Sequence, residues 1–340
     1  MMTAEPPTRL SRIDVRSIDP ELLLVLNPRA GQKLGLHTNA ASIDAVEGAL
    51  RDAGIHVQVR LTERPKQATE LAREAVRSGC KLVIAAGGDG TVAETGQALA
   101  GTQAVLGIMP MGSIMNTARM LCIPRDLRAA ARVIANGQVL AMDVGRVLAG
   151  PPATQRETIF LEAGGVGLAA GLFGYFDRLD RGARPHGVLR GALRFLRSIG
   201  TPRLIVEADD RRFQVRSPMV TVSNGPFVGA AYALSPEARI DDGLLDVVIF
   251  RGAGVLRVLF HLLLVAGGRR RPMPREAQVL RVRRIRVVTR RRRPLPIHAD
   301  GAAVGATPAE FEVVPGALRV LVGEPSPQCA WGVDLENVTG

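Results

Sequence analysis

A glycine-rich loop behind an apolar run is the feature that most constrains how this chain can fold. Residues 82–86 read Leu-Val-Ile-Ala-Ala, and residues 87–91 read Gly-Gly-Asp-Gly-Thr. A β-branched apolar run that ends in glycines predicts a buried strand, a tight turn and a helix that begins behind the turn. Glycines let a phosphate approach the backbone closely, and the N-terminus of a helix offers free N–H groups and a positive dipole end. The loop therefore predicts a phosphate-binding turn.

Asp89 and Thr91 give this turn its chemistry. A carboxylate among amides that bind an anion would repel phosphate, unless it holds a magnesium ion or accepts a hydrogen bond from the ligand. Thr91 can cap the helix or donate a hydrogen bond to a phosphate oxygen. An ordinary capped turn between a strand and a helix uses the same residue types, so the loop by itself leaves both interpretations open.

Length and composition limit the class of protein. A chain of 340 residues suits two domains, and a hydrophobic share of 46% with 4% aromatic residues predicts a globular protein with an aliphatic core. Lysine occurs only at positions 33, 66 and 81, so most of the 44 basic residues are arginine, and the net charge is +12. The planar guanidinium suits phosphate, which indicates anionic lipids or nucleotides as partners. An arginine-rich proteome would produce the same bias without any function.

The cysteines and the apolar runs bear on the cellular compartment. Cys80, Cys122 and Cys329 show no spacing typical of a zinc site or a thiol redox motif, so we expect a reducing cytosol. The first 16 residues lack the apolar core of a secretory signal. The run 255–268 contains an arginine and a histidine and is shorter than the about 20 residues of a spanning helix. We expect a cytoplasmic protein that can lie against a membrane without crossing it.

Strand and helix signals alternate up to about residue 140 and then change. The alternation predicts an α/β domain with a parallel, Rossmann-like sheet whose loops collect along one edge; predicted strands lie at 21–26, 55–61, 81–86 and 105–109, and predicted helices at 39–53 and 67–78. From residue 142 onward, short alternating runs predict a mainly antiparallel β-sandwich, with a helix at 188–199 and an apolar stretch at 255–265.

The expected organisation has four parts. They are a disordered leader over 1–19, a nucleotide-binding α/β domain over 20–141, a β-sandwich domain for the acceptor over 142–325, and a tail over 326–340.

Short motifs along the chain resemble, in order and spacing, those of the bacterial diacylglycerol kinase-like lipid kinases. Residues 87–91 are similar to the signature loop of their superfamily, which also contains sphingosine kinases, NAD kinases and phosphofructokinases. Asn27-Pro28-x-x-Gly31 is similar to the family's first nucleotide loop, and the stretch 236–246, which ends Asp-Asp-Gly-Leu-Leu-Asp, to a segment of its second domain. The resemblance covers most of the chain.

The resemblance implies ATP as the phosphate donor and Mg²⁺ as the metal ion. The nucleotide contacts that it implies fall on Asn27, Pro28, Arg29, Ala30, Gly31, Thr62, Gly87, Gly88, Asp89, Gly90, Thr91 and Ser113. Asp89 is also the implied catalytic residue that organises magnesium and phosphate. Relatives hold a structural magnesium in the second segment, which implies the Asp242 carboxylate with the carbonyls of Arg239 and Leu244 here.

Two departures from the family pattern stand out. Met115 and Asn116 occupy positions that are usually Asn and Asp, and Asp300-Gly301-Ala302 replaces the family's Asp-Gly-Glu. That glutamate is taken as the general base in relatives, and alanine cannot remove a proton. Asp300, or His298 on the same face of a strand, is the candidate replacement base. A packed histidine and a turn-capping or metal-orienting aspartate are the structural alternatives.

The sequence as a whole predicts an ATP-dependent lipid kinase of phospholipid biosynthesis, with a diacylglycerol-like acceptor. One alternative is a catalytically impaired, nucleotide-binding lipid sensor or regulator, and a second is an NAD kinase-like enzyme. The arginine clusters 269–271 and 290–293, with the apolar stretch 255–265, predict a peripheral contact with an anionic membrane surface at the inner face; charged sheet edges are the alternative. Nucleic acid is not expected, since aromatic residues are scarce. The sequence leaves a homodimer as an open alternative.

Overall fold

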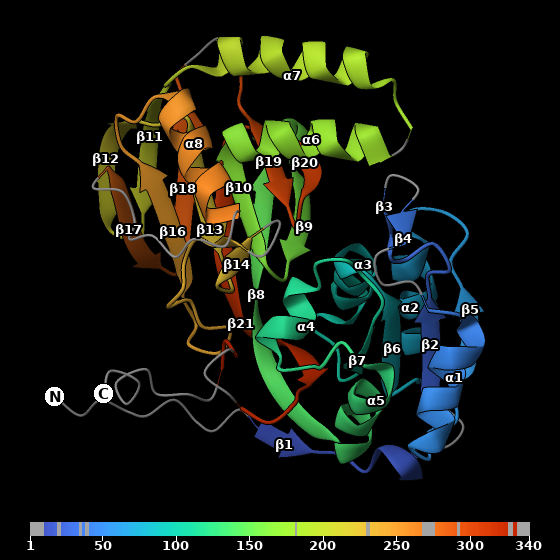
Figure 1. The fold of residues 1–340 in the computed structure, drawn as a ribbon. Helices are drawn as coiled ribbons and strands as arrows, with labels where there is room; N and C mark the ends of the chain where they lie inside the picture. The colour runs from blue at the N-terminus through green and yellow to red at the C-terminus, as the bar shows by residue number, and fades with distance from the viewer. Residues whose placement is uncertain are drawn as a thin grey trace, which may run out of the picture. The chain divides into compact units, whose positions relative to one another are not determined.

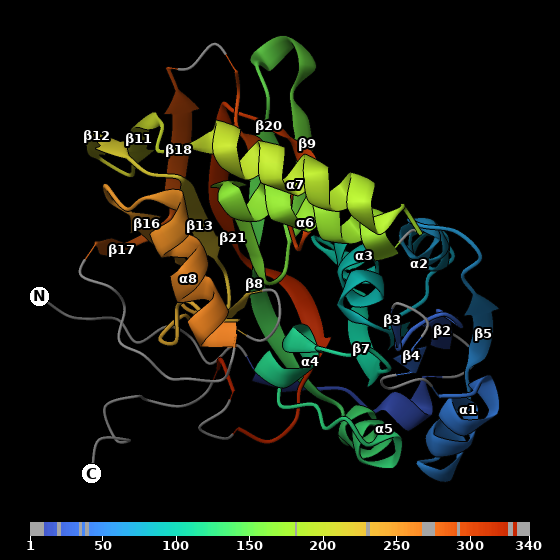
Figure 2. The ribbon, with the colours of Figure 1, turned by 45° about the horizontal axis from the view of Figure 1, so that its top comes forward.

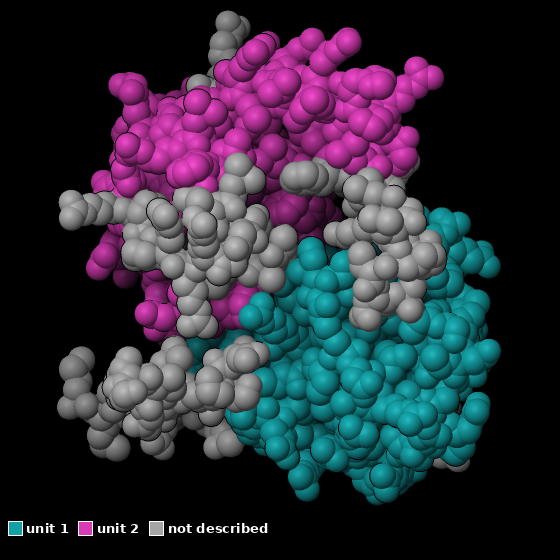
Figure 3. All heavy atoms as spheres, in the orientation of Figure 1, with its two compact units in different colours: residues 1–144, 239–243, 315–340 teal, residues 145–238, 244–314 magenta. Residues whose placement is uncertain are grey.

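The computed structural model describes residues 10–18, 22–33, 36–37, 41–180, 182–228, 232–266, 276–290, 293–325 and 329–331. The chain divides into two compact units (Figure 3). Unit 1 comprises Met1–Val144, Arg239–Gly243 and Pro315–Gly340, and unit 2 comprises Gly145–Ala238 and Leu244–Val314.

Unit 1 is built on a parallel sheet in the order β7-β6-β2-β5 (Figure 1). Its strands are β2 (Leu22–Leu26), β5 (Gln58–Leu61), β6 (Leu82–Gly87) and β7 (Val105–Pro110). The strands β2, β6 and β7 are buried throughout, which explains why their sequences are unbroken apolar runs rather than alternating ones. The end of β21 (Ala309–Leu321) adds to β7 in parallel, with Arg319 opposite Val105.

Two of the helices of unit 1, α1 (Ile43–Asp52) and α5 (Leu127–Asn136), begin at side-chain caps. Unit 1 also contains α2 (Gln67–Arg77), α3 (Asp89–Leu99) and α4 (Asn116–Met120). The Ser42 hydroxyl accepts from Ala45 N before α1, and the Asp126 carboxylate accepts from Ala129 N before α5. The helix α5 ends at Gly137, whose φ is +65°. A short hairpin, β3 (Gln32–Lys33) and β4 (Leu36–His37), follows β2.

Unit 2 contains two sets of antiparallel strands. The first is a six-stranded sheet in the order β17-β16-β13-β10-β19-β20, made of Ala277–Val282, Leu245–Phe250, Met219–Ser223, Ala163–Gly167, Pro296–Ala299 and Ala302–Ala306. The second contains β12 (Arg211–Arg216), β11 (Arg203–Ala208), β18 (Arg284–Thr289) and the start of β21. A further pair joins the end of β8 (Gln138–Ala149) to β9 (Arg156–Phe160).

The core of unit 2 includes residues from both faces of the six-stranded sheet, and helices cover one of these faces. The rings of Phe160 and Phe311 meet edge to face, and a Cβ on Gly164 would touch both. On the opposite face α6 (Leu168–Asp180) lies over β19 and β20, and α7 (Pro185–Ile199) lies outside α6 (Figures 1 and 2). The helix α8 (Val255–Ala266) and the small pair β14 (Phe227–Val228) and β15 (Tyr232–Ala233) complete the unit.

The α/β fold with a β-sandwich second part is confirmed, and the part boundaries need correction. Residues 10–18 are not disordered: β1 (Leu10–Arg12) pairs with β8, and η1 (Val15–Ser17) buries Val15. The segments 239–243 and 315–325 belong to unit 1 rather than to the sandwich. The reason is that the buried Asp143 carboxylate accepts hydrogen bonds from Gly243 N and Gly316 N.

The cysteines depart from the expectation of a reducing setting. Cys122 and Cys329 form a disulfide across 207 residues of sequence, and Cys80 is not disulfide-bonded. Ala330 N donates to Met120 O at 3.0 Å beside this disulfide, and Trp331 is buried. The fold brings Cys122 and Cys329 together, and their spacing along the sequence did not indicate this disulfide.

None of the helices among the described residues is long and apolar enough to cross a membrane.

Candidate active site

The predicted nucleotide residues follow directly on the C-terminal ends of the parallel strands of unit 1. Asn27 comes after β2, Thr62 after β5, Gly88 after β6 and Ser113 shortly after β7. Thr62 N donates to Leu26 O at 2.9 Å, and Met111 N donates to Gly87 O at 3.0 Å. Because parallel strands end at the same edge of a sheet, these loops form one rim.

The turn at Asn27 is tied to the glycine loop by its own side chain. Asn27 Nδ2 donates to Thr91 Oγ1 at 3.2 Å, and Asn27 Oδ1 accepts from Arg29 N at 3.0 Å. Pro28 and Arg29 are exposed, whereas Ala30 is buried. Gly31 has a φ of +75°, a conformation that side chains disfavour. The amide of Asn27 thereby orients the Thr91 hydroxyl and shapes the 27–31 turn at the same time.

Glycines in and next to the loop fall into two groups, those that packing requires and one that packing does not explain. A Cβ on Gly87 would lie 2.5 Å from the Thr91 side chain, and one on Gly112 would lie 2.6 Å from Gly88 Cα, so packing requires both. A Cβ on Gly90 would meet nothing within 4 Å. Glycine in a helix is less stable than alanine by about 0.5–1 kcal/mol, so Gly90 is unexplained by the protein's own packing. Its open backbone at the first turn of α3 suits a ligand that comes close.

Asp89 connects the glycine loop to the segment after β7. Its Oδ2 accepts from Met115 N at 2.9 Å, and its Oδ1 accepts from Thr117 N at 3.3 Å. Met115 has a φ of +56°, and its Sδ accepts from Gly112 N. Asp89 therefore binds the backbone N–H at position 115, a contact that does not involve the side chain there.

Two residues that support this rim were missed from the sequence. Arg125 Nη2 donates to Ser113 O at 2.6 Å and to Ile114 O at 2.7 Å, so it fixes the loop that contains Ser113. Glu94 accepts from Lys66 N at 3.0 Å, and burial raises the pKa of its carboxyl above the ordinary value. The sequence did not single out Arg125, because it contains many arginines. Glu94 was missed because its contact is with a loop distant in the sequence.

The loop 239–244, implied as a magnesium site, is held in place by a carboxylate that sequence reasoning missed. Asp143 is fully buried; it accepts from Gly243 N at 2.6 Å and from Gly316 N at 2.7 Å, and its own N–H donates to Ile240 O. The Arg239 side chain pairs with Asp241 at 3.1 Å rather than with Asp242. The Asp242 carboxylate and the main-chain oxygens of Arg239 and Leu244 are donors of the kind that Mg²⁺ prefers.

No cluster of three or more His, Cys, Asp or Glu side chains suited to a metal gathers in the described part of the chain. A single carboxylate with two carbonyls does not amount to such a cluster.

In unit 2, Asp300 holds a turn. Its carboxylate accepts from Leu161 N at 2.8 Å, from Glu162 N at 2.9 Å and from Ala163 N at 3.1 Å. The turn-capping interpretation therefore describes its observed contacts. Ala302 is exposed at the start of β20.

His298 is fully buried against Phe173, with ring centroids 4.9 Å apart. Neither ring nitrogen has a hydrogen-bond partner among the described residues, and burial lowers the pKa of the imidazole to about 4. An imidazole with so low a pKa is a weak base at neutral pH.

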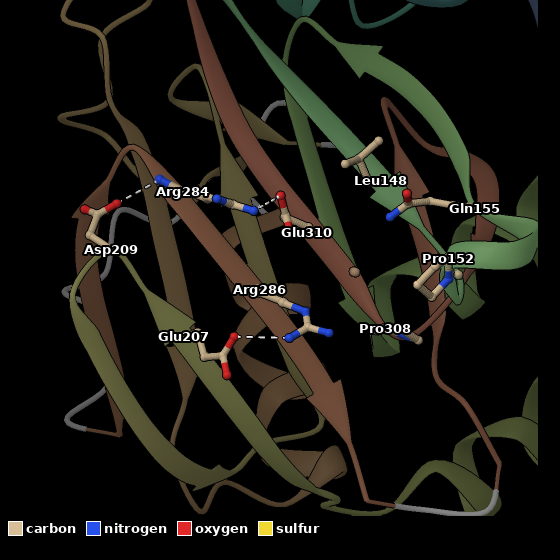
Figure 4. A pocket seen from close by; sticks show the side chains of 11 residues that line it. Leu148, Pro152, Gln155, Glu207, Asp209, Arg284, Arg286, Pro308 and Glu310 are labelled. Atoms are coloured by element: carbon tan, nitrogen blue, oxygen red, sulfur yellow. Dashed lines mark hydrogen bonds and ion pairs between the residues drawn. The ribbon is translucent and has the colours of Figure 1, made fainter.

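A separate cavity of about 490 Å³ in unit 2 is lined by matched charges (Figure 4). Glu207 pairs with Arg286 at 3.3 Å, Arg284 pairs with Glu310 at 2.5 Å, and Asp209 accepts from Arg284 N. These arginines already face carboxylates, so the cavity is a poorer phosphate site than the rim of unit 1.

Comparison with known proteins agrees with the motifs. Residues 21–147 match the model of the diacylglycerol kinase catalytic domain, and residues 177–322 match that of the YegS C-terminal NAD kinase beta sandwich-like domain. A Cronobacter sakazakii protein named "Probable lipid kinase YegS-like" is 30% identical over 247 residues, which cover 69% of this chain and 79% of that protein. A Salmonella arizonae protein named "Probable lipid kinase YegS" is 27% identical over 310 residues, covering 88% and 95%.

The fold agrees as well. The crystal structure of a diacylglycerol kinase from Bacillus anthracis superposes with a TM-score of 0.65 at 23% identity, covering 89% of this chain and 96% of that one. The two family models, the relatives and the geometry of the rim lead to one assignment: the chain belongs to the YegS-like, diacylglycerol kinase-related family of lipid kinases.

Proposed function

We propose that the protein transfers the γ-phosphate of ATP, with Mg²⁺, to the hydroxyl of a diacylglycerol-like lipid. The observation that carries the proposal is the rim of unit 1, where Asn27, Thr91 and Asp89 join three loops by hydrogen bonds around the start of α3. The N-cap of α3 is Gly88, which makes no side-chain capping bond. The first N–H groups of the helix are then directed at an anion.

The chain's own residues have distinct tasks in such a transfer. Phosphoryl transfer depends mainly on placing donor and acceptor in line and on neutralising charge. The amides of the glycine loop and the Thr91 hydroxyl would bind phosphate oxygens, while the Asp89 carboxylate would help to hold the Mg²⁺ that accompanies them. Asp242 with the carbonyls of Arg239 and Leu244 would hold a structural Mg²⁺. When bound, Mg²⁺ neutralises charge on the transferring group.

Proton removal from the acceptor hydroxyl needs a residue other than the family's glutamate. General-base assistance is worth about 10²- to 10⁴-fold in rate, so alanine at position 302 leaves room for a slow kinase. Asp300 and His298 are the two candidates for a replacement. Asp300 is the better one, since the residue is only half-buried, whereas His298 is fully buried and a weak base.

Contact with an anionic membrane surface is the third part of the proposal, and the helices of unit 2 support it. Leu256 and Phe260 of α8 are 80% and 62% exposed, and Leu189 and Leu193 of α7 are 60% and 45% exposed. On each helix the two lie four residues apart and share a face. The predicted cluster 269–271 and residues 291–292 lie outside the described residues.

Asp89→Asn is the direct test. We expect loss of about 100-fold or more of phosphorylated lipid when the purified protein is given labelled ATP, Mg²⁺ and a lipid extract, with thermal stability retained. Asp126→Asn is the matched control, because Asp126 is another aspartate of unit 1 whose carboxylate accepts from a helix N–H group, that of Ala129. Equal turnover in both variants would contradict the site. ATP binding without a phosphorylated lipid would indicate a nucleotide-binding lipid sensor. Formation of labelled NADP from NAD would indicate an NAD kinase-like enzyme.

A further inference from the structure

The C-terminal segment of the chain returns to unit 1 beside α4. Residues 329–331, here called the strap, are tied to that helix by the disulfide between Cys329 and Cys122. Cys122 lies two residues after the end of α4. Within the strap, Ala330 and Trp331 are buried. The disulfide therefore fixes a buried piece of the C-terminal segment to one end of a short helix.

Ala330 connects two parts of unit 1 through its backbone. Its N–H donates to the carbonyl of Met120, the last residue of α4, at 3.0 Å, and its carbonyl accepts from Ile240 N at 3.1 Å. Ile240 belongs to the loop that Asp143 anchors, since Asp143 N donates to Ile240 O at 2.7 Å. One residue of the strap thus bridges the end of α4 and the loop 239–243.

The helix α4 depends on such contacts, because it contains only five residues. A helix of this length is at best marginal in water without tertiary contacts. The Asp89 carboxylate holds its start by accepting from Met115 N and Thr117 N. Ala330 holds its last residue. Loss of the strap would therefore loosen the same short helix whose N–H groups orient Asp89.

The backbone at the end of α4 is shaped by its C-terminal neighbours. Cys122 has a φ of +56°, a conformation that side chains disfavour. A Cβ on Gly323 would lie 2.0 Å from Cys122 O, and Gly323 N donates to Leu121 O at 2.9 Å. This end of the helix therefore follows the segment that packs on it, rather than its own conformational preference.

The disulfide can be reached by a reductant, because Cys122 and Cys329 are both partly exposed. A thiolate of a dithiol attacks one sulfur while the other leaves as a thiolate, and the second thiol of the dithiol then displaces the mixed disulfide. Two electrons and two protons pass to the protein, which gains two thiols, and the dithiol becomes a cyclic disulfide. Disulfides of cytosolic proteins, the compartment that the sequence predicts, are usually transient or redox-sensing.

We propose that the strap positions α4 and the loop 239–243 for catalysis, and that reduction of Cys122–Cys329 by a dithiol releases the strap and lowers the kinase activity. The inference rests on the proposed function, since α4 orients Asp89 in the site of that reaction. The oxidised protein is then the more active form. A disulfide that only stabilised the fold would lower the Tm on reduction and leave the kcat of the folded protein unchanged.

Hydrogen exchange of the full chain measures release of the strap directly. We expect dithiothreitol to speed exchange of the Ile240 amide by at least about 10-fold, because this N–H loses its acceptor when Ala330 leaves. Peptides that cover β6 should exchange equally in both states, since β6 is buried in the sheet. Alkylation with iodoacetamide, read by mass, verifies the redox state of each sample. Unchanged exchange at Ile240 would overturn the strap.

The kinase assay, run below the Tm of the reduced protein, measures the consequence. We expect reduction to lower kcat by about 3- to 10-fold, the worth of one hydrogen bond. The KM for ATP should change by less than about 2-fold, because the glycine loop keeps its own contacts. Reoxidation with glutathione disulfide should restore kcat, which shows that the protein stayed folded. Equal kcat in the two states would overturn the role of the strap in catalysis.

Cysteine variants identify the responsible bond. The double variant Cys122→Ser with Cys329→Ser should match the reduced wild type in both measurements and should not respond to dithiothreitol. Cys80→Ser is the control: Cys80 takes no part in the disulfide, so its variant should keep the full response. A full response in the double variant would assign the effect to another group and overturn the proposal.

The two measurements separate this inference from the proposed function. Phosphorylated lipid formed with the same kcat in both redox states would leave the function standing and remove the redox control. Faster exchange at Ile240 on reduction, without phosphorylated lipid in either state, would support the strap and count against the function.

Discussion

His298 links the burial of one imidazole to the pH dependence of stability. The pKa of its ring is about 4 in the folded protein and about 6.5 in an unfolded chain. Below pH 6.5 the imidazole binds a proton in the unfolded state but stays unprotonated in the folded state. The free energy of unfolding therefore falls as the pH falls from 6.5 to 4. The loss amounts to about 3 kcal/mol across that window, at about 1.4 kcal/mol for each pH unit.

Urea unfolding of the wild type and of His298→Phe at pH 7, 5 and 4 would measure this contribution. The variant should keep about 3 kcal/mol more of its stability between pH 6.5 and 4 than the wild type keeps. Equal losses in the two proteins would show that the ring is solvated in solution.

Asp143 should be more important for stability than any partly exposed ion pair in the same loop. Asp143→Ala leaves the N–H groups of Gly243 and Gly316 without their acceptor, and we expect a loss of about 2–4 kcal/mol. Asp241→Ala, which removes the partner of Arg239, should cost less than about 1 kcal/mol. Chemical denaturation gives both values. A larger effect at Asp241 would contradict the role of Asp143.

Individual residues were predictable where chemistry is local. The glycine loop, Asn27 and Thr62 stand next to strand ends, so their placement on one rim followed from strand order. Asp143 and Arg125 act on backbone groups far along the chain or after an irregular turn, and a single sequence does not reveal such partners.

At the level of elements, α7 has an exposed surface that suits contact with a membrane. Its exposed Leu189 and Leu193 lie beside three exposed arginines, Arg190, Arg194 and Arg197. Such a surface matches a membrane, because the leucines suit the apolar interior and the arginines suit anionic head groups. We expect the double change Leu189→Ser and Leu193→Ser to lower sedimentation with vesicles that contain anionic lipid by several fold. Leu61→Ser, an exposed leucine of unit 1, is the control and should have no effect. Binding that is equal with and without anionic lipid would exclude the charge component.

Elements were predictable when burial left a pattern in the sequence. The strands β2, β6 and β7 are buried on both faces and read as apolar runs, and α7 shows helical spacing. The strand β1, Leu-Ser-Arg, has no strand signal of its own, since its order depends on pairing with β8. The helix α6 was missed because its glycines resemble a loop, whereas packing against α7 and β19 makes it helical.

On the scale of the molecule, the disulfide Cys122–Cys329 closes a large part of the chain into one loop. Cross-links over long loops stabilise mainly by restricting the unfolded chain, and about 2–5 kcal/mol is typical. We expect a reducing agent, or Cys329→Ser, to lower the Tm, and Cys80→Ser to leave it unchanged. An identical Tm with and without the reducing agent would show that the bond does not form in solution.

Unit 1 is assembled from three separate stretches of chain, with unit 2 inserted between them. Exchanging a whole unit between relatives by gene fusion therefore needs junctions at 144/145, 238/239, 243/244 and 314/315 together. A chimaera with a single crossover would combine Asp143 from one parent with the loops that it anchors from the other. A stable exchange of units between relatives should therefore transfer these segments together, never one half of the gene.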